Sequence, residues 1–230
     1  PVYVNMLFRP MRWLADKFNT LQMALVAGER VFNILDSDEM TEESKTPTLI
    51  KVPLHGEVEF DQVYFAYDGE NDVLKDVSFK IPAGQTLAIV GSTGSGKSTI
   101  INLLNRFYDI RAGHIRIDGL DIRDYKLDEL RDRLAIVLQD VFLFSGSVWD
   151  NISLRNPEIS REKMLEASKV IGAHPFIEAL PGGYDYHIAE RGGNLSMGQR
   201  QLISFVRALV YDPEILILDE ATSSIDTETE

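Results

Sequence analysis

One short glycine-rich segment constrains the fold of this chain more than any other part of its sequence. The segment is Gly91-Ser92-Thr93-Gly94-Ser95-Gly96-Lys97-Ser98, and it follows the apolar run Leu87 to Val90. After it, residues 100–107 have apolar side chains at helical spacing. A strand, a glycine-rich turn and a helix in this order form a loop whose backbone N–H groups surround phosphate oxygens at the helix N-terminus. The sequence therefore predicts a buried strand, residues 87–90, that leads into a P-loop.

The residue types in this loop suit a nucleotide and a metal ion. Glycine lets the backbone approach phosphate closely, so we expect the whole segment 91–99, which includes Thr99, to contact the nucleotide. Lys97 is expected to supply positive charge to the β- and γ-phosphates, and the hydroxyl of Ser98 to ligate Mg²⁺. The predicted cofactors are therefore ATP and Mg²⁺.

A pair of carboxylates ends a second apolar segment late in the chain. Residues 215–218 predict a buried strand, and Asp219 and Glu220 follow it directly. Ligands of open α/β sheets bind at the carboxyl ends of the strands. Asp219 suits Mg²⁺ coordination, and Glu220 suits polarisation of the water that attacks the γ-phosphate. An acidic strand end by itself is more often a solvated cap, but its pairing with the P-loop favours phosphate chemistry.

The rest of the main domain alternates between strand and helix patterns, which predicts an α/β fold around a mainly parallel sheet. Residues 160–180 have mostly helical spacing. The other predicted strands are residues 58–60, 63–65, 73–81, 115–117 and 135–138.

The first 36 residues predict an amphipathic helix. Apolar residues recur in steps of three and four from Met11 to Leu35, and Pro10 fits only near the start of such a helix. At about 1.5 Å per residue it would be roughly 37 Å long, more than one layer of a compact domain needs. A core or coiled-coil helix and a connecting stalk both fit this periodicity. Residues 37–55 are acidic and predict a linker, so the main domain is expected to span residues 56–230.

Composition and charge restrict the class of partner. The 230 residues include 23 basic and 36 acidic side chains, and the resulting net charge of −13 would repel the backbone of a nucleic acid. We therefore expect no nucleic-acid partner. No apolar run reaches membrane-spanning length, and nothing in the sequence predicts secretion. Cysteine is absent and the four histidines lack metal-site spacing, so we expect no thiolate or histidine metal site.

A third motif makes a family resemblance specific. Leu195-Ser196-Met197-Gly198-Gln199 precedes an apolar helical stretch, and its serine suits an N-cap. The P-loop, this motif and the Asp219-Glu220 pair, in this order, resemble the ATPase domain of ABC transporters over about three-quarters of the chain. The resemblance implies a P-loop NTPase fold with an antiparallel β subdomain and a helical subdomain. It also implies two copies that enclose two ATP molecules, with Ser196, Gly198 and Gln199 facing the nucleotide of the partner.

The resemblance also assigns roles to residues that mean little alone. Tyr67 matches the aromatic residue that stacks on adenine, and Gln139 matches the glutamine that contacts Mg²⁺ or the attacking water. Ser224-Ile225-Asp226 resembles the loop that crosses to the second copy. The implied catalytic residues are Lys97, Gln139 and Glu220. The implied metal ligands are Ser98, Gln139 and Asp219. The family carries a switch histidine after the carboxylate pair, and no histidine follows Glu220 here, so we expect poor hydrolysis by this chain alone.

Several segments resemble exporters within this family. Glu190-Arg191-Gly192 resembles the loop that contacts the transmembrane domain, and residues 142–152 resemble the exporter pattern after Gln139. Residues 1–36 resemble the cytoplasmic end of the last transmembrane helix of fused exporters. We therefore expect ATP hydrolysis that powers export, at the cytoplasmic face of a bacterial inner membrane, with a transmembrane domain as partner. The alternatives are an ABC ATPase acting on DNA or the ribosome, and a fragment that binds ATP without turnover.

Met197 departs from the resemblance, because the family signature usually has glycine there. Glycine leaves room for the backbone to approach the γ-phosphate of the opposite copy, and methionine would crowd it. We therefore expect a heterodimer rather than a homodimer, in which this subunit holds the active nucleotide site and lends Met197 to a weaker one. A flexible methionine that packs aside is the alternative.

Overall fold

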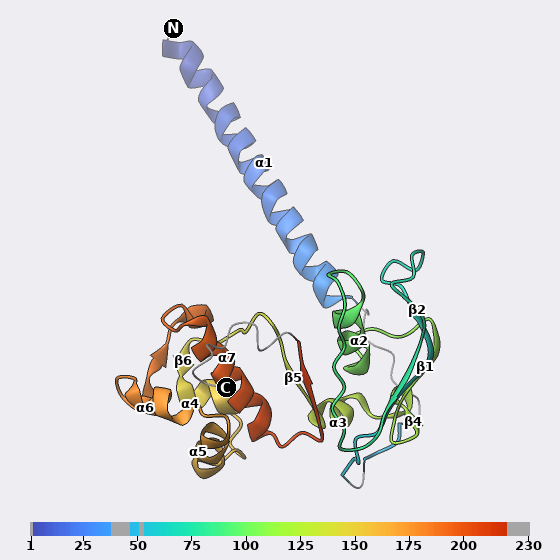
Figure 1. Cartoon of the computed structure of the whole chain (residues 1–230). Helices are drawn as coiled ribbons and strands as arrows, with labels where there is room; N and C mark the ends of the chain where they lie inside the picture. Colours follow the sequence, from blue (N-terminus) through green and yellow to red (C-terminus); the bar gives the residue numbers. More distant parts are fainter. Residues whose placement is uncertain (1, 38–46, 51–52, 220–230) are drawn as a thin grey trace. The chain divides into compact units, whose positions relative to one another are not determined.

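The computed structural model describes residues 2–37, 47–50 and 53–219, and the chain forms two compact units, residues 1–41 and 42–230 (Figure 1). Glu220 and the segment 224–226 lie outside the described residues. In the described part, the fold is mixed α/β, with an antiparallel sheet, a parallel strand pair and a group of helices. The predicted fold class is therefore confirmed, with corrections to three of its elements.

The first unit contains one long helix, α1 (Val2–Leu35). Pro10 lies inside α1, more than two turns after Val2, so the prediction that this proline lies near the helix start was wrong. An internal proline removes one backbone hydrogen bond and costs about 3 kcal/mol, and helix-forming residues on both sides outweigh that cost. Large apolar side chains of α1, among them Trp13, Leu14 and Phe18, are more than half exposed. Among the described residues, none of the helices combines the length and apolar character that crossing a bilayer requires.

The second unit contains an antiparallel sheet in the order β2-β1-β3-β4. Its strands are β1 (Val58–Phe65), β2 (Leu74–Ile81), β3 (Ala112–Ile117) and β4 (Leu120–Asp121). The two predicted strands at 58–60 and 63–65 form the single strand β1, with a register shift beside Gln62, whose φ is +48°. Because one extra residue reverses the alternation of side chains, the shift keeps Phe60 and Val63 on the same buried face.

Two parallel strands continue the second unit, β5 (Leu134–Val137) and β8 (Ile215–Leu218). The predicted strand at residues 87–90 is not formed, and Val90 is 88% exposed. A strand needs a neighbour for its hydrogen bonds, and within the described residues no strand pairs with this segment. The predicted burial of β8 was also wrong, since Leu216 and Leu218 are nearly half exposed on a strand that pairs with β5.

Helices pack around a second apolar core. They are α4 (Val148–Ser153), α5 (Arg161–Val170), α6 (His174–Ala179) and α7 (Met197–Val210). Fully buried side chains of this core include Leu143, Ile152, Ile177 and Ile203. The predicted helical stretch at 160–180 corresponds to α5 and α6. The short strands β6 (Gly146–Ser147) and β7 (His187–Ile188) pair beside these helices, and α2 (Lys97–Leu104) and α3 (Leu127–Asp132) belong to the strand-rich part.

Candidate functional site

The glycine-rich loop ends at the first turn of α2. Gly96 is the residue before this helix and has a φ of +90°, a conformation that favours glycine. A Cβ atom at Gly96 would also lie 2.7 Å from Cδ2 of Leu74. The first N–H groups of a helix have no partner within it, so the start of α2 presents donors to an anion. The loop therefore has the backbone that the P-loop prediction requires.

Lys97, the first residue of α2, folds back over the loop. Its Nζ donates hydrogen bonds to the carbonyl oxygens of Gly91 at 3.0 Å and Ser92 at 3.1 Å. Both acceptors are neutral, so these bonds leave the charge of the ammonium group uncompensated. A partly exposed cation held at a loop of N–H donors suits the binding of phosphate.

A cavity of about 460 Å³ brings most of the predicted nucleotide residues together. The predicted residues that line it are Tyr67, Thr93, Gly94, Gly96, Lys97, Ser98, Thr99, Gln139 and Asp219. Gly91, Ser92 and Ser95 belong to the same loop but are not among its lining residues. The hydroxyl of Ser98, the amide of Gln139 and the carboxylate of Asp219 are oxygen ligands of the kind that Mg²⁺ prefers. The residues present therefore fit a nucleotide with its magnesium ion.

Tyr67 lies at one side of this cavity with its ring held by neighbours. Its ring makes edge-to-face contacts with the rings of Phe65 and Tyr108, with centroid-to-centroid distances of 4.7 Å and 5.0 Å. Its hydroxyl lies 3.1 Å from Oγ1 of Thr99 in α2. The side chain nevertheless stays half exposed. A fixed and partly open ring is suited to stacking on a base.

Gln139 and Asp219 meet because their strands are parallel neighbours. Val137 pairs with Leu218, and the N–H of Asp219 donates to the carbonyl oxygen of Val137 at 2.9 Å. The carboxyl ends of β5 and β8 therefore lie side by side, and the residues that follow both strands line the same cavity. Sequence reasoning found both residues, one from its strand pattern and the other from the family resemblance.

The predicted signature motif begins helix α7. Ser196 is its N-cap, and its Oγ accepts from the N–H of Gln199 at 3.2 Å while Oε1 of Gln199 accepts from the N–H of Ser196 at 2.9 Å. This reciprocal pair is a capping box. Ser196, Gly198 and Gln199 do not line the nucleotide cavity of their own chain. Met197, in the first turn, is 43% exposed.

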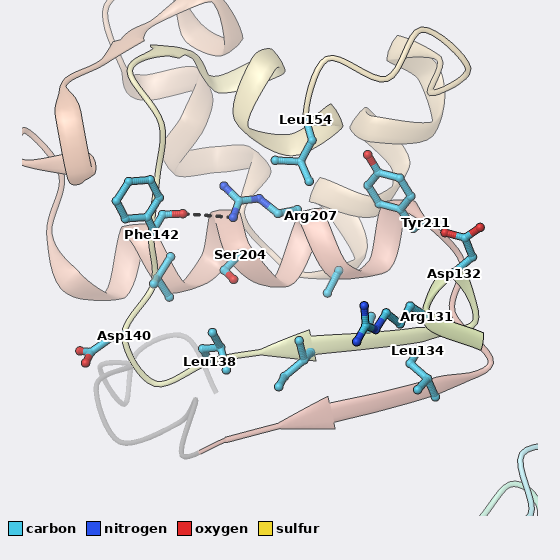
Figure 2. A pocket seen from close by; sticks show the side chains of 14 residues that line it. Arg131, Asp132, Leu134, Leu138, Asp140, Phe142, Leu154, Ser204, Arg207 and Tyr211 are labelled. Atoms are coloured by element: carbon cyan, nitrogen blue, oxygen red, sulfur yellow. Dashed lines mark hydrogen bonds between the residues drawn. The ribbon is translucent and has the colours of Figure 1, made fainter. Parts of the chain in front are cut away.

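Arg207, which no sequence motif predicted, links the helices to the segment after Gln139. Its Nε donates to the carbonyl oxygen of Asn151 at 2.8 Å and its Nη1 to that of Phe142 at 3.1 Å, the bond drawn in Figure 2. Burial lowers the pKa of Arg207. An arginine between Val206 and Ala208, in an apolar helical stretch, was the available signal. Arg207 also lines a cavity of about 320 Å³ between β5 and α7 (Figure 2).

Comparisons with known proteins agree with this geometry. The family model described as ABC transporter matches residues 74–223. An uncharacterized ABC transporter ATP-binding protein of Bacillus subtilis, YknV, is 49% identical over 228 residues, which are 99% of this chain and 38% of the relative. A probable multidrug resistance ABC transporter ATP-binding/permease protein of the same organism, YheH, is 47% identical over 99% of this chain and 33% of its own length.

A solved structure extends this agreement to the fold. The structure of a bacterial Atm1-family ABC exporter with ATP bound has a TM-score of 0.83 and 39% identity, and the match covers 99% of this chain and 40% of that chain. This chain therefore spans about a third to two fifths of the length of these proteins. The predicted family is confirmed, and its nucleotide-binding domains are ATPases. With the P-loop, the strand-end carboxylate and the capped signature helix in one unit, the chain belongs to the ABC transporter family and carries its ATP-binding domain.

Proposed function

We propose that this chain binds ATP with Mg²⁺ and hydrolyses it to power export across a membrane, from the cytoplasmic face. The observation that carries the proposal is the cavity shared by Tyr67, Lys97, Ser98, Gln139 and Asp219. The partner is a transmembrane domain, and the bacterial inner membrane is the expected location. Relatives described as a probable multidrug resistance ABC transporter and as fatty acid ABC transporters support transport as the function.

The residues divide the work in the following way. Tyr67 stacks on the adenine, and Lys97 exchanges the carbonyl oxygens of Gly91 and Ser92 for phosphate oxygens. Ser98, Gln139 and Asp219 would hold Mg²⁺, which when bound neutralises charge on the transferred phosphoryl group. Glu220 orients and polarises the attacking water. Positioning and charge, rather than covalent chemistry by the protein, account for the catalysis.

Two measurements test the function. The first is equilibrium binding of ATP by the chain, with and without Mg²⁺. The second is hydrolysis by the protein that carries the chain, reconstituted in lipid vesicles, for the wild type and for Glu220→Gln. We expect this variant to retain ATP affinity while hydrolysis falls by orders of magnitude, because the shape remains and the carboxylate charge is lost. Exposed Glu166→Gln on α5 is the matched control.

The same assays separate the competing class. An ATPase that acts on DNA or the ribosome would be stimulated by nucleic acid, in a manner that salt suppresses. The net charge of −13 argues against such binding. Stimulation by duplex DNA or ribosomes, with no dependence on lipid, would replace the proposal of export.

We further propose that the active assembly is a heterodimer. Met197 occupies the first turn of the capped helix α7 and is partly exposed, so it would face the nucleotide of the partner. The expected assembly has two unequal sites: the P-loop site of this chain is active, and the site that receives Met197 is weak. Glu220→Gln should then reduce turnover more than the equivalent change in the partner, and Met197→Gly should raise the activity of the weak site. Equal losses from both glutamate variants, or a strict homodimer, would contradict this assignment.

A further inference from the structure

Tyr108 is an aromatic residue that contacts the nucleotide site without lining its cavity. It lies in the loop between α2 and β3 and is nearly half exposed. Its ring centroid lies 5.0 Å from that of Tyr67, with the two ring planes at 88°, and 5.8 Å from that of Phe65. Edge-to-face pairs of this kind contribute free energy beyond the apolar area that they bury. No motif in the sequence assigned a role to Tyr108.

Tyr67 itself lies outside the regular part of the sheet. It follows the end of β1 by two residues, and the last pair of β1 with β2 joins Phe65 to Leu74. A half-exposed side chain in such a place exchanges among rotamers unless its neighbours hold it. A base that stacks on a mobile ring must restrict that motion at a cost in free energy, and a ring held beforehand avoids this cost. The neighbours of the Tyr67 ring therefore affect the affinity for the base.

The loop that carries Tyr108 is held at both of its ends. At its start, the guanidinium of Arg131 in α3 donates to the carbonyl oxygens of residues 105 and 106, at 3.2 Å and 2.9 Å. At its end, the N–H of Arg111 donates to the carbonyl oxygen of Tyr64 in β1 at 2.9 Å. A residue between two fixed points has little freedom to move. Tyr108 is therefore placed to support the ring that it contacts.

We propose that Tyr108 is a positioning residue of the nucleotide site, whose ring holds the ring of Tyr67 in place for stacking on the base of ATP. Phe65, which is buried in the core, supports the Tyr67 ring from β1, and Tyr108 supports it from the loop after α2. Tyr108 does not line the nucleotide cavity, so it acts through Tyr67. This support serves the base alone, because the phosphates bind at Lys97 and the rest of the P-loop. The inference rests on the proposed function, in which Tyr67 stacks on adenine.

The first test separates the base from the phosphates. Calorimetry measures the binding of ATP and of inorganic tripolyphosphate to the chain, each with Mg²⁺. Tyr108→Leu removes the ring and keeps an apolar side chain, so it should weaken ATP binding about three- to tenfold and leave the affinity for tripolyphosphate within about twofold. Tyr108→Phe keeps the ring and should restore the affinity for ATP. Tyr211→Leu, the control, removes another partly exposed tyrosine ring of the same unit and should change neither affinity.

A double-mutant cycle tests whether Tyr108 acts through Tyr67. In the Tyr67→Ala background, Tyr108→Leu should have no further effect on ATP affinity, because the ring that it positions is gone. Three results would each overturn the proposal: additive losses in the double variant, an unchanged ATP affinity in Tyr108→Leu, or equal weakening of ATP and tripolyphosphate binding. The last of these would mean a general loss of structure.

A measurement without nucleotide keeps the positioning role distinguishable from the proposed function. In NMR spectra of the chain with isotope-labelled tyrosine rings, the signals of Tyr67 are identified by their loss in Tyr67→Phe. Tyr108→Leu should move these signals toward those of an unstructured tyrosine, whereas Tyr211→Leu should leave them in place. Unmoved Tyr67 signals in Tyr108→Leu would overturn the positioning role. If the wild-type chain binds no ATP, the proposed function fails, and the NMR result decides whether Tyr108 holds Tyr67.

Discussion

The Nζ atom of Lys97 donates a hydrogen bond to the carbonyl oxygen of Gly91 at 3.0 Å, so the lysine near the end of the P-loop closes back on its first residue. A nucleotide phosphate must take the place of this carbonyl oxygen as a partner of the ammonium group. Exchange of a neutral acceptor for an anionic one favours the bound state, because the ammonium group gains a Coulombic attraction to a phosphate oxygen that a neutral carbonyl oxygen does not provide.

Lys97→Ala should therefore weaken ATP binding at least about tenfold, which corresponds to about 1.4 kcal/mol. Isothermal titration calorimetry with Mg²⁺ present measures the affinity. Exposed Lys163→Ala on α5 is the control for general loss of positive charge. Equal affinities for Lys97→Ala and the wild type would remove the phosphate role of this residue.

Tyr67 is expected to act through its ring rather than its hydroxyl. Tyr67→Ala removes the stacking surface and should weaken ATP binding by about 1–3 kcal/mol, the usual contribution of a base on an aromatic ring. Tyr67→Phe removes only the hydroxyl that lies 3.1 Å from Oγ1 of Thr99 and should bind ATP within about threefold of the wild type. Fluorescence titration with an ATP analogue compares the three proteins. A phenylalanine variant as weak as the alanine variant would assign the effect to the hydroxyl.

Arg207 should contribute strongly to stability. Arg207→Met leaves the carbonyl oxygens of Phe142 and Asn151 without their donor. Water can reach the exposed Phe142 oxygen, but the Asn151 oxygen is partly buried, and a buried acceptor left unpaired costs about 1–3 kcal/mol. Arg207→Lys keeps the positive charge, but its single ammonium group cannot donate to both carbonyl oxygens as the planar guanidinium does. We therefore expect lysine to recover only part of the lost stability. Urea unfolding at neutral pH measures both variants. Full recovery by lysine would show that charge alone matters at this position.

Asp121 should make the free energy of unfolding fall at acidic pH. Burial works to raise the pKa of its carboxyl, but hydrogen bonds from Arg123 and His114 lower the pKa to about 2. The stabilisation is therefore complete above about pH 4 and is lost as the pH falls toward 2. Asp121→Asn should lower the free energy of unfolding at pH 7 by about 1–2 kcal/mol, less than the full shift implies because Arg123 and His114 are partly exposed and screened.

Urea unfolding at pH 7 and at pH 3 checks this prediction. The difference in free energy of unfolding between Asp121→Asn and the wild type should shrink at pH 3. At this pH the Asp121 carboxyl of the unfolded chain takes up its proton, while that of the folded chain is still mostly ionised. Exposed Asp132→Asn is the control. If the difference in free energy of unfolding is the same at both pH values, the charge of the Asp121 carboxylate is not the source of the stabilisation.

Most residues of the candidate site could be predicted from the sequence because they lie in short continuous segments. Gly96 and Lys97 occupy fixed places in one continuous loop, and Asp219 follows its strand directly. Gln139 needed the family resemblance, since a lone glutamine after a strand has no meaning by pattern. Its meeting with Asp219 depends on the pairing of β5 with β8, which are far apart in the sequence.

Other features depend on long-range packing that a sequence pattern does not contain. The apolar run at 87–90 has the composition of a buried strand, but hydrogen bonds from a neighbour decide whether a strand forms. Gln62 lies between the two predicted strands, residues 58–60 and 63–65. Nothing in the sequence around Gln62 indicated that one extra residue at a register shift makes them the single strand β1. Arg207 is a polar residue in an apolar helix, and only the packed structure shows which segment it contacts.

The half-exposed strand β8 has a practical consequence for solutions of this chain. Within the described residues β8 pairs with β5 on one side, and Leu216 and Leu218 leave apolar surface around it. Open strand edges with apolar side chains recruit strands from other molecules, so the isolated chain should tend to self-associate as its concentration rises. The net charge of −13 opposes such encounters by repulsion. Added salt screens that repulsion, and low ionic strength should therefore keep the protein dispersed for longer.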